Sequence, residues 1–152
     1  MTIIAVKDGI MAADSFMFSG GVGFPSASPK ITRGSLGLIG MAGGTNDCWA
    51  VSQWWRRGCT DASPTLLKGD DGIVGLILKL DGSVWYFDDR LRPHPSIGPA
   101  AVGNNDAATF CEGALFAGLS AEEAVRLTIK HCAYAGGDVQ VERLLGESDG
   151  IL

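Results

Sequence analysis

Residue 2, directly after the initiator Met1, is a threonine. Removal of Met1 would leave Thr2 with a free α-amine beside its own hydroxyl group. A threonine hydroxyl is a weak nucleophile at neutral pH and needs a neighbouring base, and an N-terminal amine with an unperturbed pKa of about 7.7–8.0 is suited to take its proton. Thr2 therefore holds both parts of a nucleophile-and-base pair, and no histidine is required.

The other residues of nucleophilic or metal-binding type indicate no second site. His94 lies between two prolines and His131 lies near the end of an expected helix, and neither has an evident nucleophile as partner. The chain also contains four cysteines, Cys48, Cys59, Cys111 and Cys132. They lack the short paired spacing of zinc ligands, and three of them fall on expected helices, where thiols act as small core residues. We therefore expect no metal, no cofactor and no disulfide.

A β-hairpin is expected to hold Thr2 in place. Residues 2–7 are mostly β-branched or apolar, Asp8-Gly9 is a dipeptide typical of two-residue turns, and residues 10–14 continue as a second apolar strand. Apolar residues on both faces of these strands indicate that they lie inside a layered core. The hairpin would then bring the carboxylate of Asp14 back beside the start of the chain.

A second strand pair is expected after a glycine-rich loop at 19–23. Its strands are residues 29–33 and 36–45, and the second strand ends in a glycine turn that contains Gly43. A glycine at such a turn lets another backbone approach closely.

Helices and further strands complete the predicted fold. A helix is expected at 45–57, capped by the Thr45 hydroxyl, with three tryptophans that fill the core between helix and sheet. Ser120 and Glu123 have the spacing of a capping box. The remaining expected elements are a hairpin at 71–88, a proline-rich loop at 90–99, helices at 105–119 and 120–132, a strand at 139–144 and a frayed tail at 146–150.

Composition places the chain among single-domain globular proteins. With 152 residues, it can bury a sizeable core as one domain spanning 1–152. The formal net charge of −5 provides no basic face for nucleic acid. The longest apolar stretches are too short and too interrupted to cross a bilayer, and the start lacks the pattern of a secretory signal. We expect a cytoplasmic protein that contacts neither nucleic acid nor a membrane.

Five motifs follow one another in a fixed order along nearly the whole chain. They lie at residues 2–15, 30–33, 40–47, 103–118 and 120–139, the fourth being the weakest. In this order and spacing the sequence resembles the proteasome β-subunit and HslV group of N-terminal nucleophile hydrolases, particularly its short bacterial and phage-borne members. The resemblance implies an α+β fold, a four-layer α-β-β-α sandwich of two antiparallel sheets with helices outside.

The resemblance also implies roles for four residues. Thr2 matches the nucleophile, Asp14 the carboxylate that orients the site, and Lys30 the lysine that lowers the proton affinity of the nucleophile. Gly43 matches the residue whose backbone N–H binds the oxyanion. These roles are chemically consistent, because a buried ammonium stabilises a developing alkoxide and a carboxylate keeps that ammonium charged.

Three positions depart from the family pattern. Val102 or its neighbour stands where the family usually has a serine, and Cys132 and Ala135 replace two polar groups near the closing Gly-Gly. Loss of these groups would remove hydrogen bonds that position the reacting residues. Asn104 or Asp106 could compensate if the local alignment slips.

Two hypotheses follow for the function. In the first, the protein is a threonine-type peptidase or amidohydrolase that uses Thr2, after removal of Met1, on a peptide or protein substrate. In the second, it is a weakened or inactive member of the fold with a structural or assembly role, for example in a phage particle. Both predict a homo-oligomer, as a ring or a helical assembly. The sequence identifies neither an ATPase nor a virion partner, and a phage-encoded protein would lie in the host cytoplasm or the virion.

Overall fold

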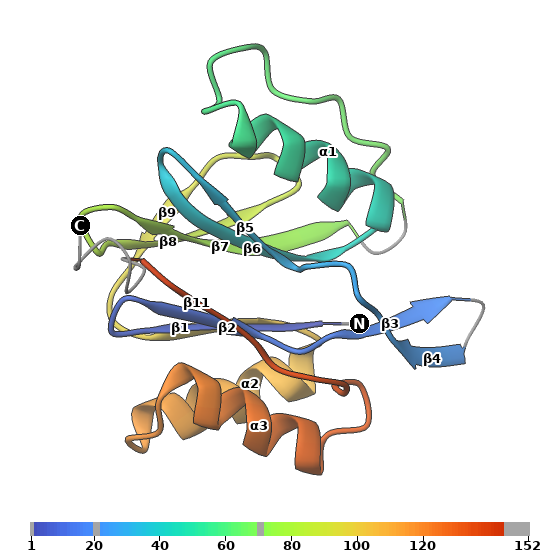
Figure 1. The fold of residues 1–152 in the computed structure, drawn as a ribbon, viewed down its shortest axis with the longest axis vertical. Helices are drawn as coiled ribbons and strands as arrows, with labels where there is room; N and C mark the ends of the chain where they lie inside the picture. Colours follow the sequence, from blue (N-terminus) through green and yellow to red (C-terminus); the bar gives the residue numbers. More distant parts are fainter. Residues whose placement is uncertain (1, 20–21, 70–71, 145–152) are drawn as a thin grey trace.

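The fold is described by a computed structural model in which residues 2–19, 22–69 and 72–144 are defined. Met1, the two glycines at 20–21 of the expected loop and the expected tail at 146–150 lie outside these residues. Helices and strands of the described residues are labelled in Figure 1. In chain order they are β1 (Ile3–Lys7), β2 (Ile10–Ala13), β3 (Phe16–Ser19), β4 (Val22–Pro25), β5 (Ile31–Gly34), β6 (Gly37–Gly43), α1 (Thr45–Arg56), β7 (Ile73–Lys79), β8 (Val84–Asp88), β9 (His94–Ser96), β10 (Ala100–Gly103), α2 (Asn105–Phe116), α3 (Ala121–His131) and β11 (Gln140–Arg143).

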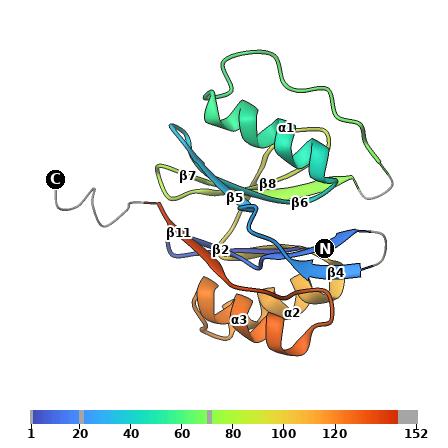
Figure 2. The same cartoon turned by 45° about the vertical axis from the view of Figure 1, so that its right-hand side comes forward.

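Two antiparallel sheets face each other in the molecule (Figure 1, Figure 2). One sheet has the strand order β10-β1-β2-β11 and the other the order β5-β6-β7-β8-β9. The predicted first hairpin is confirmed, with Asp8 and Gly9 at φ of 52° and 74° in its turn. Since β1 lies in the interior of its sheet, the chain start is held between β10 and β2.

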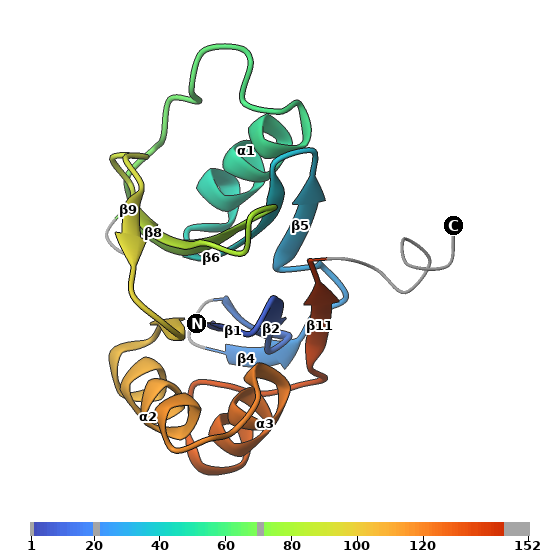
Figure 3. The ribbon, with the colours of Figure 1, turned by 90° about the vertical axis from the view of Figure 1, so that its left-hand side faces the viewer.

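The helices lie on the outer faces of the two sheets, as the end-on view in Figure 3 shows. Side chains alternate along β1, so that Ile3 and Ala5 belong to the apolar cluster that also contains Leu115 and Val125 of α2 and α3. Ile4, the next residue after Ile3, belongs instead to the cluster between the sheets. This alternation explains why the first hairpin is apolar on both faces, and the predicted combination of antiparallel sheets with helices is confirmed.

Four strands were not predicted from the sequence. The expected glycine-rich loop joins β3 and β4, which pair as a separate two-stranded ribbon. The expected proline-rich loop contains the edge strand β9, where Pro95 is tolerated because one side of the strand needs no partner. β10, which lies just before α2, is a strand because it pairs with β1 along Ile3–Val6. These short segments acquire their conformation from distant partners rather than from local propensity.

The helix starts confirm one prediction and correct another. Ser120 and Glu123 form the expected capping box at the start of α3. α1, however, has Gly44 at its N-cap without a side-chain cap bond, and Thr45 is already inside the helix. The tryptophans of α1 also differ from expectation, because Trp55 is buried at 5% exposure whereas Trp49 is 66% exposed.

Candidate active site

Asp14 is the polar centre of the site. Its side chain is fully buried at the end of the first hairpin, and both carboxylate oxygens accept hydrogen bonds. Oδ1 accepts from the backbone N–H of Ile3 at 3.0 Å and from the Lys30 ammonium at 2.9 Å, while Oδ2 accepts from the N–H of Gly136 at 3.1 Å. Three donors compensate the loss of water around the buried carboxylate.

Lys30 precedes β5 and reaches back to Asp14. Its side chain is 9% exposed and also donates to the carbonyl oxygen of Phe16 at 2.5 Å. Burial lowers the pKa of Lys30, and the nearby carboxylate of Asp14 opposes that shift without cancelling it. The Lys30 ammonium is thus fixed in place by its two hydrogen bonds, and it releases its proton more readily than a lysine in water.

Thr2, Lys30 and Gly43 line the same cavity of about 720 Å³. The carbonyl oxygen of Thr2 accepts a hydrogen bond from the backbone N–H of Asn104 at 3.2 Å. Because the N–H of Ile3 is bound to Asp14, both sides of the peptide that follows Thr2 are fixed. The structure therefore brings together the four residues that the family resemblance singled out, Asp14 lying behind Lys30.

The backbone N–H of Gly43 points away from β7. Bonded and non-bonded residue pairs alternate in an antiparallel ladder, and the N–H of Gly44 donates to the carbonyl oxygen of Gly72. The Gly43–Ile73 pair is then a non-bonded one, with its N–H directed to the other side of β6. On that side the register with β5 ends at Gly40, so among the described residues no strand covers the last three residues of β6.

Gly43 is required at this position by its conformation and by its neighbours. Its φ is +132°, and an added Cβ would lie 2.1 Å from the carbonyl oxygen of Gly72. The glycine therefore allows β6 and the residue before β7 to approach closely beside the cavity.

Cys48 also lines the cavity and, like Thr2, has a side chain of nucleophilic type. Burial is the main cause that raises the pKa of its thiol to about 11, and the charge of Asp47 adds to the shift. A thiol reacts as the thiolate, so Cys48 is a poor nucleophile at neutral pH. Thr2 is the better candidate of the two.

None of the three described residues at 101–103, where the family usually carries a serine, has a hydroxyl group. Val102 is buried in the apolar cluster between the sheets. A side chain at Gly103 would meet the carbonyl oxygen of Thr2 at 1.8 Å. Asn104 is the residue of this segment that lies beside Thr2, and its side chain accepts from the N–H of Ala107 at 3.4 Å.

The closing motif supports Asp14 through its backbone. Ala135 is buried among the side chains between sheet and helices, and Cys132 caps the end of α3. Polar contacts in this region include those of Gly136, whose N–H donates to Asp14 and whose carbonyl oxygen accepts from the N–H of Ser15. The Ser15 hydroxyl also donates to the carbonyl oxygen of Asp138. A main-chain donor of the closing segment thus supports Asp14.

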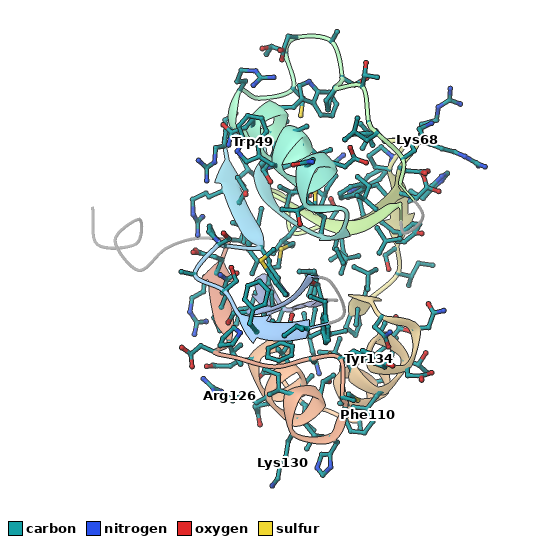
Figure 4. All side chains as sticks on the ribbon, turned by 90° about the vertical axis from the view of Figure 1, so that its right-hand side faces the viewer. Trp49, Lys68, Phe110, Arg126, Lys130 and Tyr134 are labelled. Atoms are coloured by element: carbon teal, nitrogen blue, oxygen red, sulfur yellow. The ribbon has the colours of Figure 1, made fainter. Side chains whose placement is uncertain are left out.

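The walls of the cavity include residues that the sequence did not identify. Trp49 projects from α1 and Tyr134 follows α3, and both are labelled in Figure 4. Both side chains line the cavity. Tyr134 also contacts the ring of Phe18 in β3, with centroids 6.0 Å apart. β3 and α1 thus form walls of the cavity that Thr2 also lines. For Trp49 the available signal was tryptophans at helical spacing, but a core position is the commoner meaning of that pattern. For Tyr134, which lies outside a helix, the sequence offered no such signal.

This chain is similar to known proteins in its three-dimensional structure but not detectably in its sequence. No protein-family model matches the sequence, and no curated protein matches it. Thiobacillus denitrificans BPH in complex with epoxomicin superposes with a TM-score of 0.68 at 15% identity, covering 95% of this chain and 99% of that chain. Eukaryotic HslV from Trypanosoma brucei gives a TM-score of 0.68 at 19% identity, covering 93% and 98%. The chain has a proteasome β-subunit/HslV-like fold. This result confirms the resemblance seen in the motifs.

The HslV-like fold spans nearly the whole chain, since the two superpositions cover 95% and 93% of it. Among the described residues no group of three or more His, Cys, Asp or Glu side chains is placed to bind a metal. No helix in the described part of the chain is long and apolar enough to cross a membrane.

Proposed function

We propose that the protein is a threonine-type peptidase of the N-terminal nucleophile class, with Thr2 as nucleophile after removal of Met1. The observation that carries the proposal is the placement of Thr2, Lys30 and Gly43 around one cavity, with Asp14 holding the lysine. An HslV-like fold supports it, because solved structures of this shape include HslV. The whole chain would act as one domain with the α-β-β-α layer order.

The proposed reaction proceeds through an ester of Thr2. The Thr2 hydroxyl oxygen attacks the carbonyl carbon of a peptide bond, and the α-amine takes the hydroxyl proton. The C–N bond then breaks, and that proton passes to the leaving amine. A water molecule attacks the ester, releases the carboxylic acid and returns a proton to the Thr2 oxygen, so no external reductant, oxidant or metal is needed.

Lys30 and Gly43 would stabilise the two negative charges that develop. The Lys30 ammonium, buried and paired with Asp14, favours the alkoxide character of the Thr2 oxygen. The N–H of Gly43 would bind the oxyanion of the tetrahedral intermediate, since it faces the uncovered side of β6. An extended peptide could pair with that side of β6 and present its carbonyl group there.

Covalent labelling of Thr2 tests the proposal. Wild-type protein, Thr2→Ala and Thr2→Ser are incubated with epoxomicin, the compound found with the Thiobacillus denitrificans neighbour, and intact masses are measured. We expect the wild type to lack Met1 and to gain one epoxomicin mass, Thr2→Ser to react more slowly, and Thr2→Ala to remain unlabelled. Peptide hydrolysis should follow the same order. Folding of each variant is checked by circular dichroism.

Two results would contradict the peptidase proposal. Complete retention of Met1 would leave Thr2 without a free amine, and equal hydrolysis by Thr2→Ala would exclude Thr2 as nucleophile. A folded, processed protein that neither hydrolyses peptides nor reacts with epoxomicin would favour the structural role, for which Val102, Cys132 and Ala135 are the supporting residues. Both functions include self-association, which light scattering checks against the 15.9 kDa monomer.

A further inference from the structure

Asp47 is a buried carboxylate that the reaction above does not use. It lies in the first turn of α1 at 5% exposure, and among the described residues it has no ion pair. Its Oδ1 accepts from the backbone N–H of Leu67 at 2.8 Å and its Oδ2 accepts from the N–H of Lys68 at 3.1 Å. Both oxygens therefore hold the connection between α1 and β7.

The contacts of that connection lead back to the turn at Gly43. The carbonyl oxygen of Gly69, directly after Lys68, accepts from the N–H of Gly72 at 3.1 Å. The carbonyl oxygen of Gly72 in turn accepts from the N–H of Gly44 at 3.2 Å. The same oxygen occupies the space where a side chain of Gly43 would lie.

These contacts form a closed path. It runs from α1 through the carboxylate of Asp47 to the backbone at 67–69, then to Gly72, and from Gly72 to the two glycines that precede α1. Lys68 has a positive φ of 50°, a conformation that costs free energy for a residue with a side chain. The bond from its N–H to Asp47 stabilises that conformation.

We propose that Asp47 is a positioning residue for the oxyanion donor, which holds Gly72 against Gly43 and so fixes the direction of the Gly43 N–H. The inference rests on the proposed function. A carboxylate suits this position because it supplies two charged acceptors to two adjacent backbone N–H groups. Displacing a reacting group by about 1 Å costs about a hundredfold in rate, so a small shift of Gly72 is sufficient.

The test compares Asp47→Ala and Asp47→Asn with Asp61→Ala. Asp61 lies in the same connection, and its carboxylate makes an exposed ion pair with Arg57, so it controls for loss of a loop carboxylate. We expect Asp47→Ala to lower kcat for peptide hydrolysis about tenfold to a hundredfold with little change in KM. Asp47→Asn keeps one acceptor, so its kcat should fall less than that of Asp47→Ala. The kcat of Asp61→Ala should match that of the wild type.

Hydrogen exchange supplies a readout that does not depend on activity. Overlapping peptides that cover 40–48 and 64–69 are followed by mass spectrometry. In Asp47→Ala we expect faster exchange at the N–H groups of Gly44, Leu67 and Lys68, with exchange in the first hairpin unchanged. Asp61→Ala should change none of the three. If Asp47→Ala does not fold, the same measurements on Asp47→Asn test the positioning role.

The outcomes separate this inference from the proposed function. Unchanged exchange at Gly44 in a folded Asp47 variant overturns the inference, as does an unchanged kcat in an active enzyme. A parallel rise in KM, or loss of activity shared with Asp61→Ala, also overturns it, because it indicates a general effect of the loop. If the wild type shows no Thr2-dependent hydrolysis, the proposed function fails, and the positioning role fails with it whatever the exchange at Gly44.

Discussion

The ammonium of Lys30 and the carboxylate of Asp14 form the buried ion pair of the site, with the two atoms 2.9 Å apart. Removing one partner of such a pair leaves the other charged and unpaired, at a cost of about 3–5 kcal/mol. Lys30→Met should therefore lose hydrolysis and lower the free energy of unfolding by about that amount, as measured by urea denaturation. The double variant Lys30→Met/Asp14→Asn should recover part of the stability but none of the activity. Stability of Lys30→Met equal to the wild type would contradict the pairing.

Cys48 provides a prediction about pH. Because burial raises the pKa of its thiol to about 11, its thiolate fraction should increase about tenfold per pH unit between pH 7 and pH 10. Alkylation by iodoacetamide should be slow at pH 7.5 and rise with this slope, as followed by mass spectrometry of the Cys48 peptide. A rate that levels off above about pH 9 would show an ordinary thiol. Such a thiol would be a rival nucleophile in the cavity.

At the scale of elements, the junction of β6 and α1 depends on two adjacent glycines with different requirements. Gly43 has a positive φ and no room for a side chain, whereas Gly44 has a φ of −58° and no atom within 4 Å of an added Cβ. Gly43→Ala should destabilise the protein by about 1–3 kcal/mol and abolish hydrolysis, and Gly44→Ala should be close to neutral. Thermal melts and peptide hydrolysis measure both. If Gly43→Ala is as stable as the wild type, the backbone at Gly72 can move away from the added methyl group at little cost in free energy.

Elements with strong local signals could be predicted from the sequence, and those set by distant partners could not. Asp8-Gly9 and Asp81-Gly82 identified two hairpins, and the Ser120 capping box identified the start of α3. β10 and the β3–β4 ribbon have no such signal, because a strand four residues long is defined by the strand beside it.

The same limit applies to the site. Motif order proposed Thr2, Asp14, Lys30 and Gly43 as site residues, and the structure places them together. The main-chain donors of Asn104 and Gly136 depend on tertiary contacts that residue type does not encode.

The distribution of charge over the whole molecule predicts a substrate preference. The chain carries a formal net charge of −5, but the described lining of the cavity contains Lys30 and Arg56 and no carboxylate. Lys30 is paired with Asp14, and Arg56 has no ion pair among the described residues. A peptide with an acidic residue should therefore be hydrolysed faster than one with lysine at the same position.

Arg56→Gln should reduce this preference about two- to fivefold, the scale of an exposed ion pair, and added salt should reduce it as well. The ratio of kcat/KM for two peptides that differ only by Glu or Lys measures the effect. Arg57→Gln serves as control, since Arg57 pairs with Asp61 and lies outside the cavity lining. An equal loss in both variants would assign the preference to net charge rather than to Arg56.

The three partners of Asp14 also determine when during synthesis the site can exist. Ile3 and Lys30 leave the ribosome early, whereas Gly136 is made near the end of the described chain. β10, which fixes the carbonyl oxygen of Thr2 through the adjacent Asn104, is likewise made after two thirds of the chain. A nascent or prematurely terminated chain consequently carries Thr2 without its ordered surroundings. Under the proposed function, hydrolysis by Thr2 requires translation to have passed residue 136, and incomplete copies of the chain would be inactive.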